Sequence, residues 1–268
     1  MGIMPLVTVV LAVYNGSELI ASALKSIEEQ TFRDWECVVC DDGSTDKTWE
    51  IIKNIADNNS KIIPVRNNEN RGAAYARNRC IDIAKGKYIA IQDADDISYP
   101  TRFEEQVNFL DVFSDVSVVG SYTTLSDTNS RFWGEIKAPE VPRNVDWLKG
   151  TQVLHASVMM RREDVILAGK YDERLPQAED YDLFIRMVAK GFQIRTLPKP
   201  LYDVHWDLSD YLRKTKKYRW NEFRVHLRAL RLLNIAPYYA IYLLKPIIVG
   251  AIPVKCLYKH HYNKLKRN

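Results

Sequence analysis

The sequence predicts an α/β protein in which helices flank a mostly parallel central sheet. Over about the first 100 residues, short runs of apolar and β-branched residues alternate with segments whose apolar residues recur at helical spacing. The connections between these runs are short, which is typical of strand–helix–strand units. The composition is that of a globular protein, because 46% of the 268 residues are hydrophobic and 27% are charged.

The first strand is expected at Leu6–Val13, a continuous apolar run of the kind that is buried on both faces of a sheet. Ser17 is then placed to cap a helix that runs to about Gln30. Further strands are expected at Trp35–Cys40, Lys61–Val65 and Lys87–Ile91, with helices between them. The last of these strands leads directly into the acidic sequence Gln92-Asp93-Ala94-Asp95-Asp96.

The pattern is looser after Pro100, and no composition break or internal repeat divides the chain before residue 208. We expect one domain over residues 1–208, with halves at about 1–100 and 101–208, and a helical basic extension over 209–268. The expected elements are helices at Thr101–Val112 and Glu179–Lys190, strands at Val116–Val119, Val153–Met160, Gln193–Leu197 and Leu201–His205, and a basic helix from Ser209 to about Leu233.

Charge is distributed unevenly along the chain. From Tyr211 to the end there are 14 lysines and arginines and one acid, Glu222, so this tail carries +13 while residues 1–210 carry −9. An acidic body with a basic tail indicates that the tail meets an anionic surface, either nucleic acid or the inner face of a membrane.

Within this tail, Ile235–Val254 is largely apolar but is interrupted by Pro237, Lys245, Pro246 and Pro253. A membrane-spanning helix needs about 20 apolar residues, preferably unbroken, so we favour an interfacial or re-entrant segment over a true span. The alternative is a helix that packs on the domain's own core. Met1–Leu6 lacks the features of a signal peptide, so we expect a cytoplasmic protein that is peripheral on the inner face of the cell membrane, without nucleic acid as a partner.

The acidic sequence after the fourth strand is the strongest chemical signal. Asp93, Asp95 and Asp96 repel one another unless a cation neutralises them, and they follow a buried strand at the sheet edge where α/β proteins bind ligands. Carboxylates and substrate phosphates are the ligands that Mg²⁺ prefers. The alternative is a solvated turn with an aspartate that caps the next helix. His205 is a further candidate ligand for the same metal.

Two other acidic pairs allow more than one interpretation. Asp41 and Asp42 follow the second strand, where a carboxylate can accept a hydrogen bond from a nucleotide, but Asp42-Gly43 is also an ordinary turn sequence. Glu179 and Asp180 begin a helix, where acids complement the helix dipole, and a carboxylate there can also act as a general base.

Other patterns exclude common functions. Cys37 and Cys40 form a C-x-x-C pair, but residues three apart on a strand point to opposite faces, so we expect two core cysteines. The sequence has no phosphate loop, no dinucleotide-binding glycine fingerprint and no serine-hydrolase elbow.

An ordered set of motifs resembles the family 2 glycosyltransferases, which have the GT-A fold with a Rossmann-like sheet. The set covers about residues 5–205 and comprises Val7-Thr8-Val9-Val10, Tyr14-Asn15-Gly16, Ser26-Ile27 with Gln30-Thr31-Phe32, Asp41 to Asp46, Asn70-Arg71-Gly72 with Ala76-Arg77-Asn78, Asp93-Ala94-Asp95-Asp96 and Glu179-Asp180. The family transfers sugars from nucleotide diphosphates with inversion. Residues 1–100 would then be the nucleotide-sugar half and 101–208 the acceptor half.

The resemblance implies a role for each site residue. Ala12, Tyr14 and Glu18 would border the nucleotide base, Asp42 would accept its N–H, and Arg71 would lie beside it. Asp93 would hold the ribose or the water shell of the metal, Asp95 would ligate Mg²⁺ or Mn²⁺, and Asp180, with Glu179 adjacent, would be the general base.

The resemblance therefore implies an inverting hexosyltransferase-like enzyme that uses a nucleotide-sugar donor, with UDP-sugars favoured, in bacterial surface polysaccharide assembly. The acceptor would be a glycan or a lipid-linked glycan. The sequence lacks a clear Q-x-x-R-W motif, because Lys217-Tyr218-Arg219-Trp220 keeps only Arg-Trp, so single addition is favoured over polymer synthesis. Two alternatives are a polyprenyl-phosphate sugar transferase and a non-enzymatic nucleotide- or nucleic-acid-binding protein.

Overall fold

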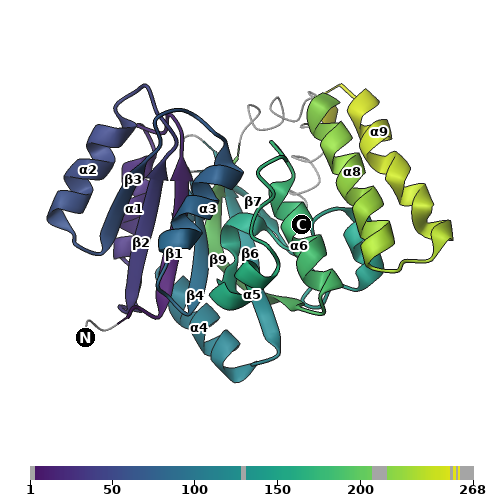
Figure 1. Cartoon of the computed structure of the whole chain (residues 1–268), viewed down its shortest axis with the longest axis horizontal. Helices are drawn as coiled ribbons and strands as arrows, with labels where there is room; N and C mark the ends of the chain where they lie inside the picture. The colour runs from purple at the N-terminus through teal and green to yellow at the C-terminus, as the bar shows by residue number, and fades with distance from the viewer. Residues whose placement is uncertain (1–3, 128–130, 207–215, 254–255, 258, 260–268) are drawn as a thin grey trace.

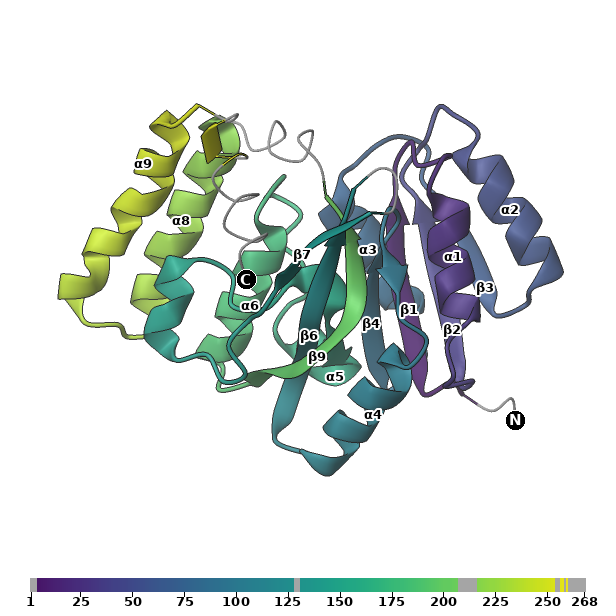
Figure 2. The same ribbon diagram turned by 180° about the vertical axis from the view of Figure 1, so that it is seen from behind.

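The structure is a computed structural model that describes residues 4–127, 131–206, 216–253, 256–257 and 259 (Figures 1 and 2). The first half contains β1 (Val7–Val13), α1 (Ile20–Glu28), β2 (Trp35–Asp41), α2 (Thr48–Asn58), β3 (Ile62–Arg66), α3 (Ala73–Ile83), β4 (Tyr88–Asp93) and β5 (Ile97–Ser98). The second half contains α4 (Arg102–Val112), β6 (Val116–Ser126), β7 (Phe132–Ile136), the 3₁₀ turns η1 (Asn144–Lys149) and η2 (His155–Ser157), β8 (Met159–Arg161), α5 (Arg162–Leu167), α6 (Glu179–Ala189), β9 (Gln193–His205), α8 (Lys216–Leu232), the 3₁₀ helix η3 (Pro237–Leu243) and α9 (Leu244–Ala251).

One mixed sheet forms the centre of the described chain, with strand order β3-β2-β1-β4-β8-β6-β9-β5 and β7 paired to β6. The strands β3, β2, β1 and β4 are parallel, so their carboxyl ends lie at one edge. β8 is antiparallel to both β4 and β6, and it joins this parallel part to the β6–β9 pair. The predicted α/β fold with a mostly parallel core is confirmed.

The sheet is covered on both faces (Figures 1 and 2). Alternate residues of β1 point to opposite layers: Val9 and Leu11 pack with α1 and α4, whereas Val10 packs with α3 and α6. This double burial explains the continuous apolar sequence of β1. Cys37 and Cys40 belong to opposite layers of the core, as the strand geometry predicted.

Two segments differ from the predicted elements. Val153–Met160 is not one strand, because the Ser157 hydroxyl donates to the Leu154 carbonyl over 2.9 Å and closes the turn η2 before β8. Gln193–Leu197 and Leu201–His205 are not separate strands but parts of β9. Pro198 and Pro200 are tolerated inside β9 because its register with β6 shifts at this point.

The tail packs on the domain with one of its sides. Residues 209–215 of the expected basic helix lie outside the described residues, and α8 covers most of the rest. Val225, Ala229 and Leu233 are buried in the same apolar cluster as α6. In the described parts of the chain, no helix is long and apolar enough to cross a membrane.

A close approach between β1 and the turn before β4 generates a stability prediction. The Gly86 N–H donates to Thr8 Oγ1 over 2.8 Å, and a Cβ at Gly86 would lie 2.5 Å from the backbone nitrogen of Thr8. Because backbone atoms of a central strand cannot move aside cheaply, we expect Gly86→Ala to lower the free energy of unfolding by about 2 kcal/mol. Chemical denaturation measures this value. Lys85→Ala, at the exposed neighbouring position, is the control, and equal stability of the two variants would contradict the packing described.

Candidate active site

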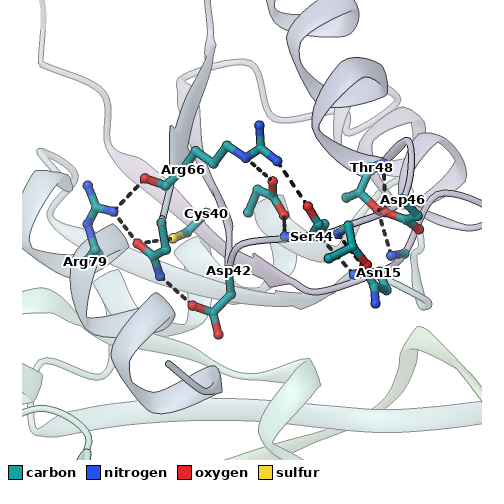
Figure 3. Close-up of polar contacts among 12 residues, drawn as sticks. Asn15, Cys40, Asp42, Ser44, Asp46, Thr48, Arg66 and Arg79 are labelled. Atoms are coloured by element: carbon teal, nitrogen blue, oxygen red, sulfur yellow. Dashed lines mark hydrogen bonds and ion pairs between the residues drawn. The ribbon is translucent and has the colours of Figure 1, made fainter. Parts of the chain in front are cut away.

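The turn after β1 is held by the loop after β2 (Figure 3). The Asn15 N–H donates to the Ser44 hydroxyl over 2.9 Å, and the Gly16 N–H donates to Thr48 Oγ1 over 2.8 Å. Ser17 does not cap α1, which begins at Ile20 without a side-chain cap, so that prediction was wrong. The Ser17 N–H instead donates to Asp46 over 3.2 Å, so these bonds place the turn at the edge of a cavity.

A cavity of about 700 Å³ lies at the carboxyl ends of β1 and β4. The predicted site residues that line it are Ala12, Tyr14, Asp93, Asp95 and His205. A second cavity of about 400 Å³ is lined by the predicted residues Glu179 and Asp180. The two cavities share Arg77, Asp93 and Asp96 in their walls, so they lie side by side.

Arg77 on α3 connects the two halves of this site. Its guanidinium lies 3.0 Å from the Asp93 carboxylate at the end of β4 and 2.8 Å from the Glu179 carboxylate at the start of α6. Only 11% of the Arg77 side chain is exposed, so this pairing occurs largely out of water. Sequence reasoning assigned no role to Arg77, although it stands beside small residues on the helix that follows β3.

The electrostatic environment differs among the carboxyl groups. Burial and, to a smaller extent, the negative charge of Glu179 raise the pKa of Asp180 to about 6. The positive charge of Arg77 acts in the opposite direction on this pKa. Burial acts to raise the pKa of Asp93, but Arg77, together with His155 and Arg102, holds that pKa below its usual value. Burial, followed by the charges of Asp93 and Asp95, raises the pKa of Asp96. A carboxyl with a raised pKa therefore faces one with a lowered pKa across Arg77.

Buried polar side chains hold the acidic turn in shape. Gln92 Nε2 donates to the carbonyl oxygens of Asp93 and Asp96 over 3.0 and 2.9 Å. Arg102 is fully buried and donates to the Ile91 carbonyl over 2.8 Å, which fixes the strand before the turn. The Asp96 carboxylate accepts the His205 backbone N–H over 2.9 Å and so brings the end of β9 to the same place.

These carboxylates fit a divalent cation that also binds a phosphate. Asp93 and Asp95 line the cavity together, and their charges raise the pKa of Asp96, which indicates an excess of negative charge. Magnesium typically takes one or two protein carboxylates and completes its coordination with phosphate and water. In the described part of the chain, no three or more histidine, cysteine or acidic side chains form a metal-binding group by themselves.

Three predicted residues do not line either cavity: Glu18, which is exposed, Asp42 and Arg71. Asp42 is buried, and its carboxylate accepts hydrogen bonds from the Asn67 side chain over 2.5 Å and from the Gly72 N–H over 2.7 Å. The Arg71 guanidinium lies 3.5 Å from the centre of the Tyr75 ring. Asp42 thus shapes the loop that carries Arg71.

A residue with a strained backbone conformation precedes the first turn of α6, which lies at the site. Ala178 has a φ of 63°, a left-handed conformation that costs a non-glycine residue roughly 1 kcal/mol. Glu179 and Asp180 follow it directly, and Arg77 contacts the first of them. His155, in the turn η2, lines the second cavity, and its Nε2 is 2.7 Å from the Tyr171 hydroxyl.

Comparisons with known proteins agree on one family. The sequence profile described as "Glycosyl transferase family 2" matches residues 8–167. EpsE of Bacillus subtilis, which carries a glycosyltransferase name, is 33% identical over 97% of this chain and 95% of its own length. The Escherichia coli UDP-Glc:alpha-D-GlcNAc-diphosphoundecaprenol beta-1,3-glucosyltransferase WfaP is 34% identical over 75% of this chain and 78% of its own.

Solved structures share the fold. Residues 1–349 of Staphylococcus aureus TarS in complex with UDP-GlcNAc superpose with a TM-score of 0.65 at 17% identity, over 97% of this chain and 88% of that one. The mannosyltransferase PcManGT of Pyrobaculum calidifontis, in complex with GDP-Man and Mn²⁺, gives 0.64 at 20% identity, over 99% and 84%. Both have the GT-A fold.

The Arg77 bridge predicts a pH-dependent loss of stability. Removal of one partner of a largely buried ion pair costs about 3 kcal/mol, so we expect Arg77→Gln to lower the free energy of unfolding by about that amount at pH 8. Asp180 already has a pKa above that of an unfolded aspartate, so its ionised form opposes folding, and more so without Arg77. The loss should therefore shrink as the pH falls through about 6 and the carboxyl groups take up protons.

Denaturation of both proteins from about pH 5 to pH 8 measures this dependence. Asp82→Asn is the matched control, because Asp82 lies on the same helix but its ion pair with Lys170, at 2.6 Å, is on the surface. It should cost less than about 1 kcal/mol at every pH in the range. A loss in Arg77→Gln that does not vary with pH would contradict the electrostatic account.

Proposed function

Because the chain belongs to glycosyltransferase family 2 and has the GT-A fold, we propose that it transfers a sugar from a nucleotide diphosphate donor to a hydroxyl of a glycan or lipid-linked glycan. The observation that carries the proposal is the pair of adjacent cavities whose shared wall contains Arg77, which links the acidic turn to the first turn of α6. A donor and an acceptor would meet at this link.

A UDP-sugar is the favoured donor. The name of the relative WfaP contains both UDP-glucose and a diphosphoundecaprenol acceptor, and one of the solved TarS structures is a complex with UDP-GlcNAc. In the proposal, Ala12 and Tyr14 border the base, which fits their positions on the wall of the larger cavity. A base that extends from this wall toward the loop at Gly72 would have Glu18 and Arg71 beside it, and Asp42, which already accepts the Gly72 N–H, would accept the base N–H.

Asp93 and Asp95, with His205 as a further ligand, would hold Mg²⁺ or Mn²⁺ beside the donor diphosphate. When bound, such a cation stabilises the negative charge that develops on a leaving diphosphate. Asp93 would also be able to reach the ribose, because its carboxylate is at the carboxyl end of β4 and part of the side chain is exposed. Arg77 keeps Asp93 ionised and so keeps it available as an oxygen ligand.

Asp180 is proposed as the general base, with Glu179 adjacent. A pKa of about 6 leaves Asp180 mostly ionised at neutral pH but gives it a greater proton affinity than an ordinary aspartate. The carboxylate would take the proton of the acceptor hydroxyl as its oxygen attacks the anomeric carbon and the bond to the diphosphate breaks. Attack from the face opposite the leaving group inverts the anomeric configuration. Glu179 is neutralised by Arg77, which leaves Asp180 as the free base of the pair.

The setting that we propose is surface polysaccharide assembly at the inner face of a bacterial cell membrane. The relatives include the amylovoran biosynthesis glycosyltransferase AmsB of Erwinia amylovora, at 27% identity, besides WfaP. A lipid-linked acceptor is met at the bilayer surface, whereas a nucleotide sugar arrives from the cytosol.

The base assignment predicts a split between catalysis and donor binding. Asp180→Asn keeps the shape of the side chain but removes the proton acceptor, so kcat should fall by about 10²–10⁴-fold while the Kd for UDP stays the same. Nucleotide release from a panel of donors with Mn²⁺ and calorimetric titration with UDP measure the two effects. Activity of the native chain should rise with pH through about 6.

Asp172→Asn is the control for that experiment, because Asp172 precedes α6 but lines neither part of the site. If donor affinity collapses in Asp180→Asn, the acid has the structural role of a first-turn residue instead.

The metal assignment predicts that Asp95→Asn abolishes transfer without loss of the fold. A missing contact to a cation at the developing phosphate charge should cost several kcal/mol in the barrier, or at least about 10²-fold in kcat. Circular dichroism and thermal unfolding monitor the fold, and excess Mn²⁺ should recover part of the activity. Full activity in EDTA would exclude the assignment.

A further inference from the structure

The C-terminal helices expose apolar side chains along one line. We define the apolar ridge as Tyr238 and Ile241 on η3, Leu244 and Ile248 on α9, and Ile252 just beyond it, with exposed fractions between 39% and 74%. Residues three apart on a 3₁₀ helix, and four apart on an α-helix, lie on the same side of the helix. The five side chains of the ridge have this spacing and therefore lie on one side of the segment. A row of large apolar groups in water is unusual on a monomeric protein and marks a surface that meets something else.

The opposite side of the same segment is fixed to the domain. Ile235, Tyr239 and Tyr242 pack against the core cluster that contains α6, and Pro246 is buried. The Lys245 ammonium donates to the Lys149 carbonyl in η1. α9 lies along α8 in both views (Figures 1 and 2). The exposure of the ridge is therefore a property of a packed segment and not of a detached one.

Charge distinguishes between the two simplest partners for the apolar ridge, which are a second copy of this chain and a lipid surface. The tail from Tyr211 onward carries +13, so a second copy docked through the ridge would bring two strongly basic tails together. Like charges in apposition oppose such a dimer, whereas an anionic lipid surface attracts the same residues at about 1 kcal/mol each. Trp220 is exposed on α8, next to Arg219, which packs against Gly250 of α9. Tryptophan and tyrosine are the side chains that are enriched at the membrane interface.

We propose that the apolar ridge is a membrane-docking surface that enters the interfacial region of an anionic bilayer, with the helices in the plane of the membrane. The proposal rests on the proposed function in that a lipid-linked acceptor explains why the enzyme is at the membrane. The proposal combines the two expectations for residues 235–254, a membrane-interface segment and a core-packed helix. One side of the segment packs on the core, and the other side would contact lipid.

An ion pair joins α8, against which α9 packs, to the helix that carries the candidate base. Arg228 of α8 pairs with Asp182 on α6, which also binds Arg186 at 2.7 Å. Asp182 is fully buried and lies two residues after Asp180. A bilayer that holds α8 and α9 thus holds α6, so that the base would keep a constant position relative to the membrane surface.

The test compares the full chain with the double variant Ile241→Ser, Ile248→Ser in flotation with vesicles of phosphatidylcholine and phosphatidylglycerol at low salt. Both positions are exposed, so the fold should persist, which circular dichroism checks. We expect the native chain to float with the vesicles and the apparent Kd to rise at least about tenfold in the variant. High salt should weaken native binding without abolishing it, because the apolar part is not screened. Val112→Ser, Leu167→Ser, at exposed apolar positions outside the tail, is the matched control and should bind as the native chain does.

A native chain that stays in solution at low salt, or a ridge variant that binds like the native chain, would overturn the proposal. A native dimer in analytical ultracentrifugation that the ridge variant loses would also overturn it, in favour of a second copy. UDP binding with Mn²⁺ separates this result from the proposed function. The ridge variant should keep native affinity for UDP, and absence of UDP binding in both proteins would count against the donor assignment alone.

Discussion

The ion bridge from Asp93 through Arg77 to Glu179 is the contact on which the rest of the site depends. It places one positive charge between two carboxylates that would otherwise repel each other. It also joins β4 to α6 through α3, although Arg77 and Glu179 are 102 positions apart in the sequence. The same guanidinium moderates the pKa of Asp180 and holds down that of Asp93. One cation therefore sets both the geometry and the protonation of a site whose parts come from three elements.

The sheet explains why those elements meet. β1, β2 and β4 are parallel neighbours, so the turns that follow them lie at one edge, and β8 reverses direction to bring the second half of the chain beside the first. Gln92 and Arg102 provide the buried hydrogen bonds that fix the acidic turn. The strain at Ala178 is located where α6 delivers its first turn to the cavity, which is where stored strain is commonly found.

Much of this arrangement could be predicted from the sequence, because it depends on local patterns. The four parallel strands follow from apolar runs, and the positions of Asp93 and Asp95 follow from the rule that ligands bind at carboxyl ends of strands. The Arg77 bridge could not be predicted, since both its partners are distant in sequence and no pattern marks an arginine that will be buried. The sequence pattern predicts a strand where the turn η2 is found. There the Ser157 hydroxyl donates to the nearby Leu154 carbonyl, whereas a strand would form a ladder of backbone hydrogen bonds with its neighbour. The sequence of the tail is consistent with both a core-packed helix and an interfacial one. In the structure, one side of the segment packs on the core and the other side exposes apolar residues.

The central claim is that the larger cavity holds the donor diphosphate on the acidic turn, beside the second cavity, which Asp180 lines. A crystal structure with UDP and Mn²⁺, with the metal located from its anomalous scattering, tests this most directly. The account predicts a manganese peak between Asp95 and the diphosphate, inside the larger cavity and on the Asp93 side of Arg77. A nucleotide bound outside this cavity, or manganese bound away from the acidic turn, would contradict it.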